Sequence, residues 1–191
     1  MASNQTSLEQ NSRDTEYLSP DVLVECRAGD RNAQRSLYEC CHSKVYRLMV
    51  RLVGVQNAED VTQQVFLQTF RKLHQFGGES RFETWLYRLA TNEALQFLRK
   101  ERRWKFQAIL VDPMSQKSDR HDGHDRRELL EQALQQLDPE LRSVFVLKEV
   151  ESLSYREIAQ VMDIPEGTVG SRLNRARREL QQHLADLGWE A

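Results

Sequence analysis

The sequence predicts an all-α protein with two small helical domains. Apolar residues recur at spacings of three and four along most of the chain, which gathers them on one face of a helix. No segment convincingly alternates β-branched with polar residues, as a half-buried strand would. The helical period fades over residues 106–125, and residues 112–119 have the composition of a linker. We therefore expect one helical domain on each side of this segment.

The first helices are expected to follow a polar tail. Ser19 and Pro20 suit the N-cap and first position of a short helix, which Gly29 ends. A longer helix then runs to Gly54. Its apolar residues follow spacings of four and three and form a buried stripe: Leu37, Cys41, Val45, Leu48 and Leu52.

The rest of the first domain is predicted to contain two more helices. Asn57 is expected to cap the first of them, with Glu59 and Asp60 in the first turn, where carboxylates favour the helix dipole. Its buried side is Val61, Val65, Phe66, Phe70 and Leu73. A break at residues 76–78 precedes a long helix over about residues 81–103. Its apolar positions are Phe82, Trp85, Leu86, Leu89, Phe97 and Leu98.

The second domain is predicted to end in a helix-turn-helix. A helix near residues 126–137 is followed by Asp138 and Pro139, which suit the cap and first position of the next helix. Residues 154–157 match the capping box S-x-x-E. A turn at residues 163–165 leads to a final helix, whose core positions are Val169, Leu173, Ala176 and Leu180. Two short helices joined by a three-residue turn are typical of this DNA-binding unit.

The distribution of charge also suggests nucleic acid. The net charge is only -2, which excludes an indiscriminate nucleic-acid binder. Residues 99–105 nevertheless hold five basic residues and residues 172–178 hold four, a pattern typical of two separate phosphate contacts. A solvated helix face is the alternative. The outward positions of the final helix are Thr168, Ser171, Arg172, Asn174, Arg175 and Arg178. Arginine and asparagine can pair bidentately with guanine and adenine.

Length, apolar runs and cysteines narrow the class of protein further. The chain has 191 residues and a mass of 22.4 kDa, and its longest apolar runs are about four residues, far short of the roughly 20 that span a bilayer. Residues 1–11 lack the features of a secretory signal. We expect a cytoplasmic protein with a disordered tail at residues 1–18. Cys26, Cys40 and Cys41 form no spaced metal or redox pair, so reduced, mostly buried thiols and no cofactor or metal are expected.

Three motifs in this order resemble the extracytoplasmic-function sigma factors of the sigma-70 family. They are NAEDVTQQVF at residues 57–66, FETWLYRLATN at residues 82–92, and LSYREIA at residues 153–159 followed by IPEGTV at residues 164–169. The resemblance implies a disordered tail (1–18), a sigma-2-like domain (19–105), a linker (106–125) and a sigma-4-like domain (126–187). It also implies a dissociable subunit without catalytic residues, which directs core RNA polymerase to promoter DNA and is often held by an anti-sigma factor.

The resemblance assigns residues to three contacts. The core-polymerase-binding residues would be Glu59, Asp60, Gln63, Gln64 and Phe66. Gln64 departs from the carboxylate usual in the family. The residues that recognise and open the minus-ten element would be Phe82, Trp85, Arg88, Asn92, Arg99, Arg102, Arg103 and Lys105. The loop over residues 76–81 resembles one that holds a flipped base, and opening requires a platform for the unstacked base. Because Trp85 lies on the apolar stripe, a place in the core is the alternative to a stacking role.

The minus-thirty-five element would be read by the second domain. The residues concerned are Thr168, Ser171, Arg172, Asn174, Arg175 and Arg178. Gly170 stands where the family commonly has a basic residue, so the target sequence is expected to be particular to this chain. A linker of about 20 residues reaches at most roughly 70 Å, about two turns of duplex, which allows both domains to bind one DNA face.

Two other classes of protein remain as alternatives. An enzyme could use the cluster of His121, Asp122, His124 and Asp125, with Asp119 nearby, as a metal or acid-base site. That cluster lies in the predicted linker, without a rigid scaffold, and does not fit a calcium-loop spacing. A transcription regulator could instead bind operators as a dimer without polymerase. It would leave the first domain unexplained.

Overall fold

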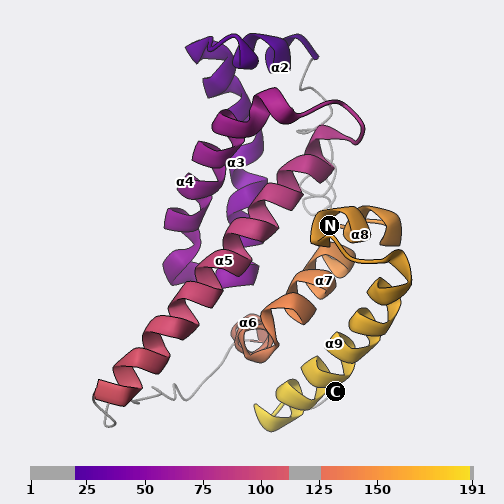
Figure 1. Ribbon diagram of the computed structural model, residues 1–191. Helices are drawn as coiled ribbons and strands as arrows, with labels where there is room; N and C mark the ends of the chain where they lie inside the picture. Colours follow the sequence, from indigo (N-terminus) through magenta and orange to yellow (C-terminus); the bar gives the residue numbers. More distant parts are fainter. Residues whose placement is uncertain (1–19, 112–125, 190–191) are drawn as a thin grey trace, which may run out of the picture.

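The computed structural model describes residues 20–111 and 126–189, and within them the chain folds as helices alone, without a strand (Figure 1). This confirms the predicted all-α class. The first group of helices is α2 (Pro20–Arg27), α3 (Arg31–Val53), α4 (Val55–Lys72), the 3₁₀ helix η1 (Leu73–Gln75) and α5 (Phe82–Val111). The second group is α6 (Arg126–Gln136), α7 (Pro139–Glu149), α8 (Tyr155–Met162) and α9 (Glu166–Asp186).

The first group packs α3, α4 and α5 around a common apolar core. The predicted stripe of α3 is confirmed, because all five of its residues are at most 1% exposed. From α4 the core receives Val61, Val65 and Phe66, whereas the predicted core residue Phe70 is only half-buried. Complete burial of an aliphatic side chain contributes about 1.5–3 kcal/mol. The stripe is therefore a main source of stability for this domain.

The junction between α3 and α4 differs from the prediction. Gly54 adopts a φ of +83° and is both the C-cap of α3 and the N-cap of α4. This left-handed backbone, easily reached only by glycine, reverses the chain so sharply that α4 begins at Val55. Asn57 is therefore not the cap; it lies inside α4, and its Nδ2 donates to the carbonyl of Val53 at 3.1 Å. Glu59 and Asp60 consequently lie beyond the first turn, which contains no acidic residue.

Helix α5 is also longer than predicted. It extends to Val111, so the first six residues of the expected linker, 106–111, continue the helix. The end of α5 projects away from the other helices at the lower left of Figure 1. The cluster around His121 and His124, the tail and Ser19 all lie outside the described residues.

The second group of helices has the predicted caps and turn. Asp138 is the N-cap of α7 and accepts a hydrogen bond from the Glu140 amide at 3.0 Å. The capping box at α8 is complete: the Ser154 hydroxyl accepts from the Glu157 amide, and the Glu157 carboxylate accepts from the Ser154 amide. Asp163, with a φ of +54°, ends α8. The predicted core stripe of α9 is buried along its whole length.

The two groups of helices pack against each other. Helix α8 lies against α5, and α6 and α7 lie against α3. One apolar cluster contains Leu86 of α5 together with Leu147 of α7 and Val161 of α8. The Tyr87 hydroxyl donates to the Glu151 carboxylate at 2.7 Å across this contact. Burial and the Glu151 charge raise the pKa of Tyr87, which keeps the phenol protonated as the donor.

The cysteines are mostly buried, as predicted. Cys26 and Cys41 are buried, Cys40 is half-buried, and all three are free thiols. Burial raises the pKa of Cys41 to about 12, so at neutral pH it remains an unreactive thiol. No helix in the described part of the chain combines the length and the apolar character needed to span a bilayer.

Candidate nucleic-acid interface

The helix-turn-helix is formed by α8, the turn at residues 163–165 and α9. Ile158 and Val161 of α8 and Val169 and Leu173 of α9 are at most 1% exposed, so the inner faces of both helices are fixed by apolar packing. This packing turns the opposite face of α9 toward solvent. Ser171, Asn174, Arg175 and Arg178 are exposed, and Thr168 and Arg172 are partly exposed. Five of the six residues predicted to read duplex DNA therefore lie on the solvent side, and the sixth, Arg172, is paired with Glu140 of α7.

Ion pairs with nearby glutamates orient the arginine side chains of α9. The Arg175 Nε donates to Glu179 at 2.7 Å within the helix, whereas Arg177 is held by Glu149 of α7 at 2.5 Å. The four basic side chains at residues 172–178 thus do not all face the same way, because Arg177 is directed toward α7 of its own domain. Ser171 is tied to the preceding turn, since its hydroxyl donates to the carbonyl of Thr168 at 2.9 Å. Gly170 lies beside the ring of Tyr155, whose Cε2 would be 3.5 Å from a Cβ at this position.

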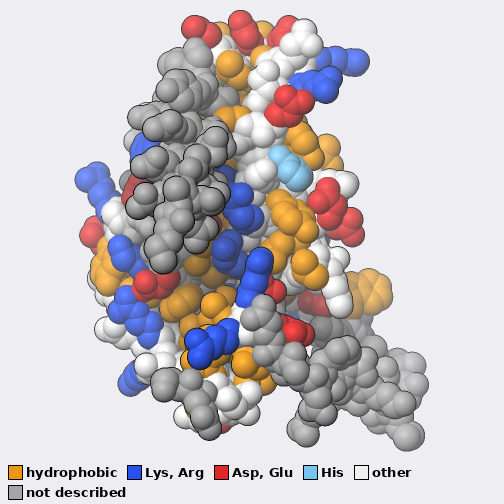
Figure 2. Space-filling model, turned by 180° about the vertical axis from the view of Figure 1, so that it is seen from behind, with side chains coloured by type: hydrophobic (Ala, Val, Ile, Leu, Met, Phe, Trp, Pro, Cys, Tyr) orange, Lys and Arg blue, Asp and Glu red, His pale blue; other side chains and the backbone are white. Residues whose placement is uncertain are grey.

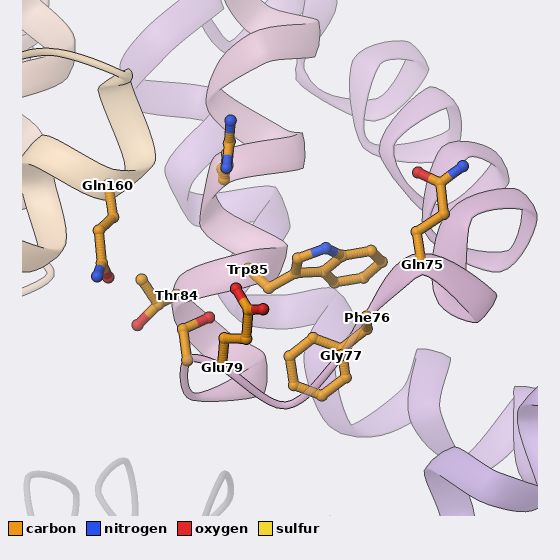
Figure 3. A pocket seen from close by; sticks show the side chains of 9 residues that line it. Gln75, Phe76, Gly77, Glu79, Thr84, Trp85 and Gln160 are labelled. Carbon is orange, nitrogen blue, oxygen red and sulfur yellow. The ribbon is translucent and has the colours of Figure 1, made fainter.

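A pocket of about 370 Å³ opens beside the start of α5. Figure 3 shows the Trp85 indole lying along it, with the Phe76 ring adjacent and Gln160 of α8 on the opposite side. The ring centroids of Trp85 and Phe76 are 5.5 Å apart, and those of Trp85 and Phe82 are 5.7 Å apart. Trp85 is only half-buried, so it presents ring surface to the pocket. Such a surface can stack on an unpaired base.

The loop that borders the pocket is anchored by Arg27. Its guanidinium lies 5.8 Å from the centroid of the Phe76 ring and also donates to the Phe76 carbonyl. Phe76 was predicted only as the first residue of this loop, without a role of its own, and Gln160 was not predicted. An aromatic residue beside two glycines was the available signal for Phe76, whereas no local pattern indicates Gln160, which is far along the chain.

The remaining residues predicted for minus-ten DNA extend along α5 in separate places. Arg88 is exposed and lines the Trp85 pocket. Asn92 and Arg99 lie further along and line a different hollow, whereas Arg102 and Arg103 are exposed near the projecting end. The side chain of Lys105 lies outside the described residues. The predicted set therefore forms a track along one helix and not a single cluster.

The hollow at Asn92 lies between the two domains. It measures about 290 Å³ and is lined by Asn92 and Arg99 of α5, Glu140 of α7 and Arg172 of α9 among others. The Glu140 carboxylate is 2.9 Å from Arg172 and 3.6 Å from Arg99. Predicted DNA-binding residues of both domains thus face one another across a single acidic side chain.

The exposed face of α4 is the predicted protein-binding surface. Glu59, Asp60, Gln63 and Gln64 are all exposed, as predicted residues for contact with a partner should be. Phe66 was predicted both for the buried side of this helix and for partner contact; it is 3% exposed, and its ring packs on Tyr38 with centroids 4.7 Å apart, which confirms the buried position. It belongs to the core because it lies on the same stripe as Val65. Leu67, which the prediction omitted, is 56% exposed and follows Glu59 and Gln63 at intervals of four residues, on one helix face.

The surface carries basic, acidic and hydrophobic side chains together. Figure 2 shows basic side chains interspersed with acidic and hydrophobic ones over the back of the molecule. In the part of the chain that the structure describes, no three His, Cys, Asp or Glu side chains are grouped as metal ligands would be.

Comparison with known proteins gives two family matches. Residues 37–104 match the family model described as sigma-70 region 2, and residues 127–180 match sigma-70, region 4. The first match ends at Trp104, close to the predicted domain boundary. The second spans α6 to α9 up to Leu180.

Two curated relatives are similar over almost their full length. The ECF RNA polymerase sigma-E factor of Haemophilus influenzae is 33% identical over 189 residues, covering 90% of this chain and 98% of that protein. The protein of the same name from Escherichia coli K12 is 33% identical over 188 residues, covering 91% and 98%. Among solved structures, the sigma factor RpoE from Bartonella quintana, crystallised with the anti-sigma factor NepR, has a TM-score of 0.65 at 24% identity, covering 79% of this chain and 96% of its own. The fold of this chain is therefore similar to that of a solved sigma factor.

Proposed function

Because the chain belongs to the ECF RNA polymerase sigma factors of the sigma-70 family, we propose that it binds core RNA polymerase and directs initiation to a particular set of promoters. One observation supports this most strongly. Trp85 and the outward arginines of α9 lie in different domains, in the chain order of sigma regions 2 and 4. A protein that reads two promoter elements needs this division.

The first domain would recognise and open the minus-ten element. An opened base pair loses its stacking, which costs a few kcal/mol, and a pocket with an aromatic wall offsets that cost. Trp85 and Phe76 offer the wall, and Arg88 at the rim offers a contact for phosphate. Asn92, Arg99, Arg102 and Arg103 would follow the strand or the adjoining duplex along α5.

The second domain would read the minus-thirty-five element as duplex. Helix α9 would enter the major groove, where Arg175 and Asn174 can reach base edges and Arg178 can reach phosphate. The domain boundaries that we propose are residues 19–105 and 126–187. Helix α5 continues to Val111 and so includes the first residues of the predicted linker 106–125.

The exposed face of α4 would bind core polymerase. Its carboxylates and amides, at Glu59, Asp60, Gln63 and Gln64, suit a polar helical partner, and Leu67 adds an apolar contact. Interfaces of this kind combine a small apolar centre with a polar rim. We propose an anti-sigma factor as a further partner, since the sigma factor RpoE of Bartonella quintana, which has a similar fold, was crystallised with such a protein. The proposed action is non-enzymatic and takes place in the cytoplasm.

The experiment that tests the proposed role of α9 compares two neighbouring arginines. Arg175→Ala removes a side chain that faces solvent, whereas Arg177→Ala removes one that is held by Glu149. Transcription by core polymerase is measured at the promoters that the unchanged protein selects. We expect about a tenfold loss for Arg175→Ala, as for one base or phosphate contact, and a smaller loss for Arg177→Ala. Equal losses would contradict the assigned orientation of α9.

A dimeric regulator that acts without polymerase is the competing function. It would bind a symmetric operator tightly and by itself. Purified protein that forms a stable dimer and selects DNA without polymerase would favour this alternative and overturn the proposal.

A further inference from the structure

The two predicted DNA-reading surfaces are joined by one carboxylate in this structure. Glu140 stands at the start of α7, directly after the cap Asp138 and Pro139. Its carboxylate is 2.9 Å from Arg172 of the helix-turn-helix and 3.6 Å from Arg99 of α5. A carboxylate between two guanidinium groups makes the same kind of charge-assisted contact as a phosphate oxygen.

Helix α8 covers the part of α5 beside the Trp85 pocket. Gln160 of α8 lines the Trp85 pocket, and α8 packs along α5 over the part that carries the pocket. A nucleic acid strand that follows α5 from Trp85 to Arg99 would meet the second domain on the way. The packed arrangement of the domains and occupation of this track by DNA therefore exclude each other.

From these contacts we propose that Glu140 is an internal competitor of promoter phosphate: it binds Arg99 and Arg172 while the domains are packed together, and DNA must displace it. The proposal rests on the proposed DNA-binding function of the two arginines. Glu140 is then a positioning residue. When the two domains pack together, which we call closure, it occupies Arg99 and Arg172 and so lowers the affinity of the free protein for DNA.

The strength of the contacts suits reversible competition. The side chains of Glu140 and Arg99 are 44% and 67% exposed, so each ion pair is screened by water and is worth little by itself. The buried Tyr87–Glu151 hydrogen bond and the shared apolar cluster supply further stability to the packed arrangement. Loss of any one of these contacts should shift the population toward separated domains without unfolding either domain.

The test uses two variants of the full-length chain that affect closure in different ways. Glu140→Gln removes the competing charge. Tyr87→Phe removes the hydrogen bond to Glu151 and changes no charge, and Tyr87 is not one of the predicted DNA-reading residues. Glu131→Gln is the matched control, because it removes the same charge in the same domain but has its ion pair with Arg127 of its own helix.

The affinity for a fluorescently labelled duplex of random sequence, roughly 30 base pairs or three helical turns, is measured by anisotropy without polymerase. We expect Glu140→Gln and Tyr87→Phe each to raise this affinity about two- to fivefold, the effect of one exposed ion pair or one hydrogen bond. Small-angle X-ray scattering should show a more extended molecule for both variants. Glu131→Gln should change the affinity only by the small effect of removing one negative charge, and it should leave the shape of the molecule unchanged.

Two results would overturn the proposal. If Glu140→Gln raises the affinity and Tyr87→Phe does not, Glu140 acts only as a local repulsive charge. If neither variant differs from Glu131→Gln, closure does not compete with DNA. Both results are independent of whether the protein directs polymerase, which transcription with the unchanged chain measures separately.

Discussion

The guanidinium of Arg142 in α7 donates a hydrogen bond of 2.5 Å to the carbonyl of Leu52, which lies 90 residues earlier at the end of α3. Arg142 is only 3% exposed, and its other acceptors are the side chain of Gln135 and the carbonyls of Gln135 and Leu137 at the end of α6. Burial lowers the pKa of Arg142 to about 10, so it remains charged at neutral pH. The positive charge is stabilised by the carbonyl ends of two helices, where the dipole favours a cation.

Replacement of this arginine should destabilise the protein. Arg142→Met keeps the length of the side chain but leaves two buried carbonyls and one partly buried carbonyl without this donor, and the loss at a buried carbonyl costs about 1–3 kcal/mol. Relief of the buried charge offsets part of this cost, so we expect a net loss of roughly 2 kcal/mol in the free energy of unfolding by urea. Arg127→Met, at an exposed ion pair, should change it by about 0.5 kcal/mol or less. If Arg142→Met is as stable as this control, the free-energy cost of burying the guanidinium charge equals the stabilisation from its hydrogen bonds, and the prediction is wrong.

The capping box predicts a dependence of stability on pH. Hydrogen bonds from the hydroxyl and amide of Ser154 hold the pKa of Glu157 below its ordinary value of 4.5. A carboxylate whose folded pKa is lowered contributes stability above the unfolded pKa and loses it as pH falls through the folded pKa. Glu157→Gln should therefore be less stable at pH 7 by about 0.5 kcal/mol, and the difference should shrink as the pH falls below 4.5. Urea unfolding at several pH values measures this, and a difference independent of pH would contradict it.

Gly170 offers a stabilising substitution. It lies inside α9, where glycine costs about 1 kcal/mol relative to alanine, and a Cβ would meet the Tyr155 ring at 3.5 Å, an ordinary contact. Gly170→Ala should raise the free energy of unfolding by about 0.5–1 kcal/mol. Gly29→Ala is the matched control and should lower it, because Gly29 has a φ of +86°. Destabilisation by Gly170→Ala would mean that α9 needs the flexibility of glycine at this point.

Trp85 should matter for promoter opening more than for duplex binding. Removal of its ring takes away a stacking surface worth about 1–3 kcal/mol per base, so Trp85→Ala should reduce the opened fraction about tenfold, measured by permanganate reactivity of unpaired thymines with polymerase present. Trp85→Tyr should restore part of the signal. Trp189→Ala is the control, since Trp189 contacts Arg126 far from the pocket. Normal opening by Trp85→Ala would place the ring in a structural role.

The local features of the fold could be predicted from the sequence because they depend on neighbours along the chain. The capping box at Ser154 and the buried stripe from Leu37 to Leu52 are both set by residues within a few turns. The start of α4 was predicted wrongly because a φ of +83° at Gly54 cannot be recognised from composition. Asn57, an apparent cap, instead continues the helix.

The parts that escaped prediction depend on contacts between distant residues. Phe66 lies on an apolar stripe next to the polar face that we propose for partner binding, and sequence does not separate these two roles. The contribution of Gln160 to the Trp85 pocket, and the position of Glu140 between Arg99 and Arg172, arise only when the two domains pack together. Periodicity describes each helix but not which helices meet.

Reconstitution with sigma-free core RNA polymerase tests the central claim most directly. The full-length protein is mixed with the core enzyme and genomic DNA, and the 5′ ends of the transcripts are sequenced with and without it. The account predicts binding to the core enzyme and new start sites that share two upstream motifs about two helical turns apart, roughly 70 Å. Absence of both core binding and new starts, with core polymerase from the same bacterium, would contradict it.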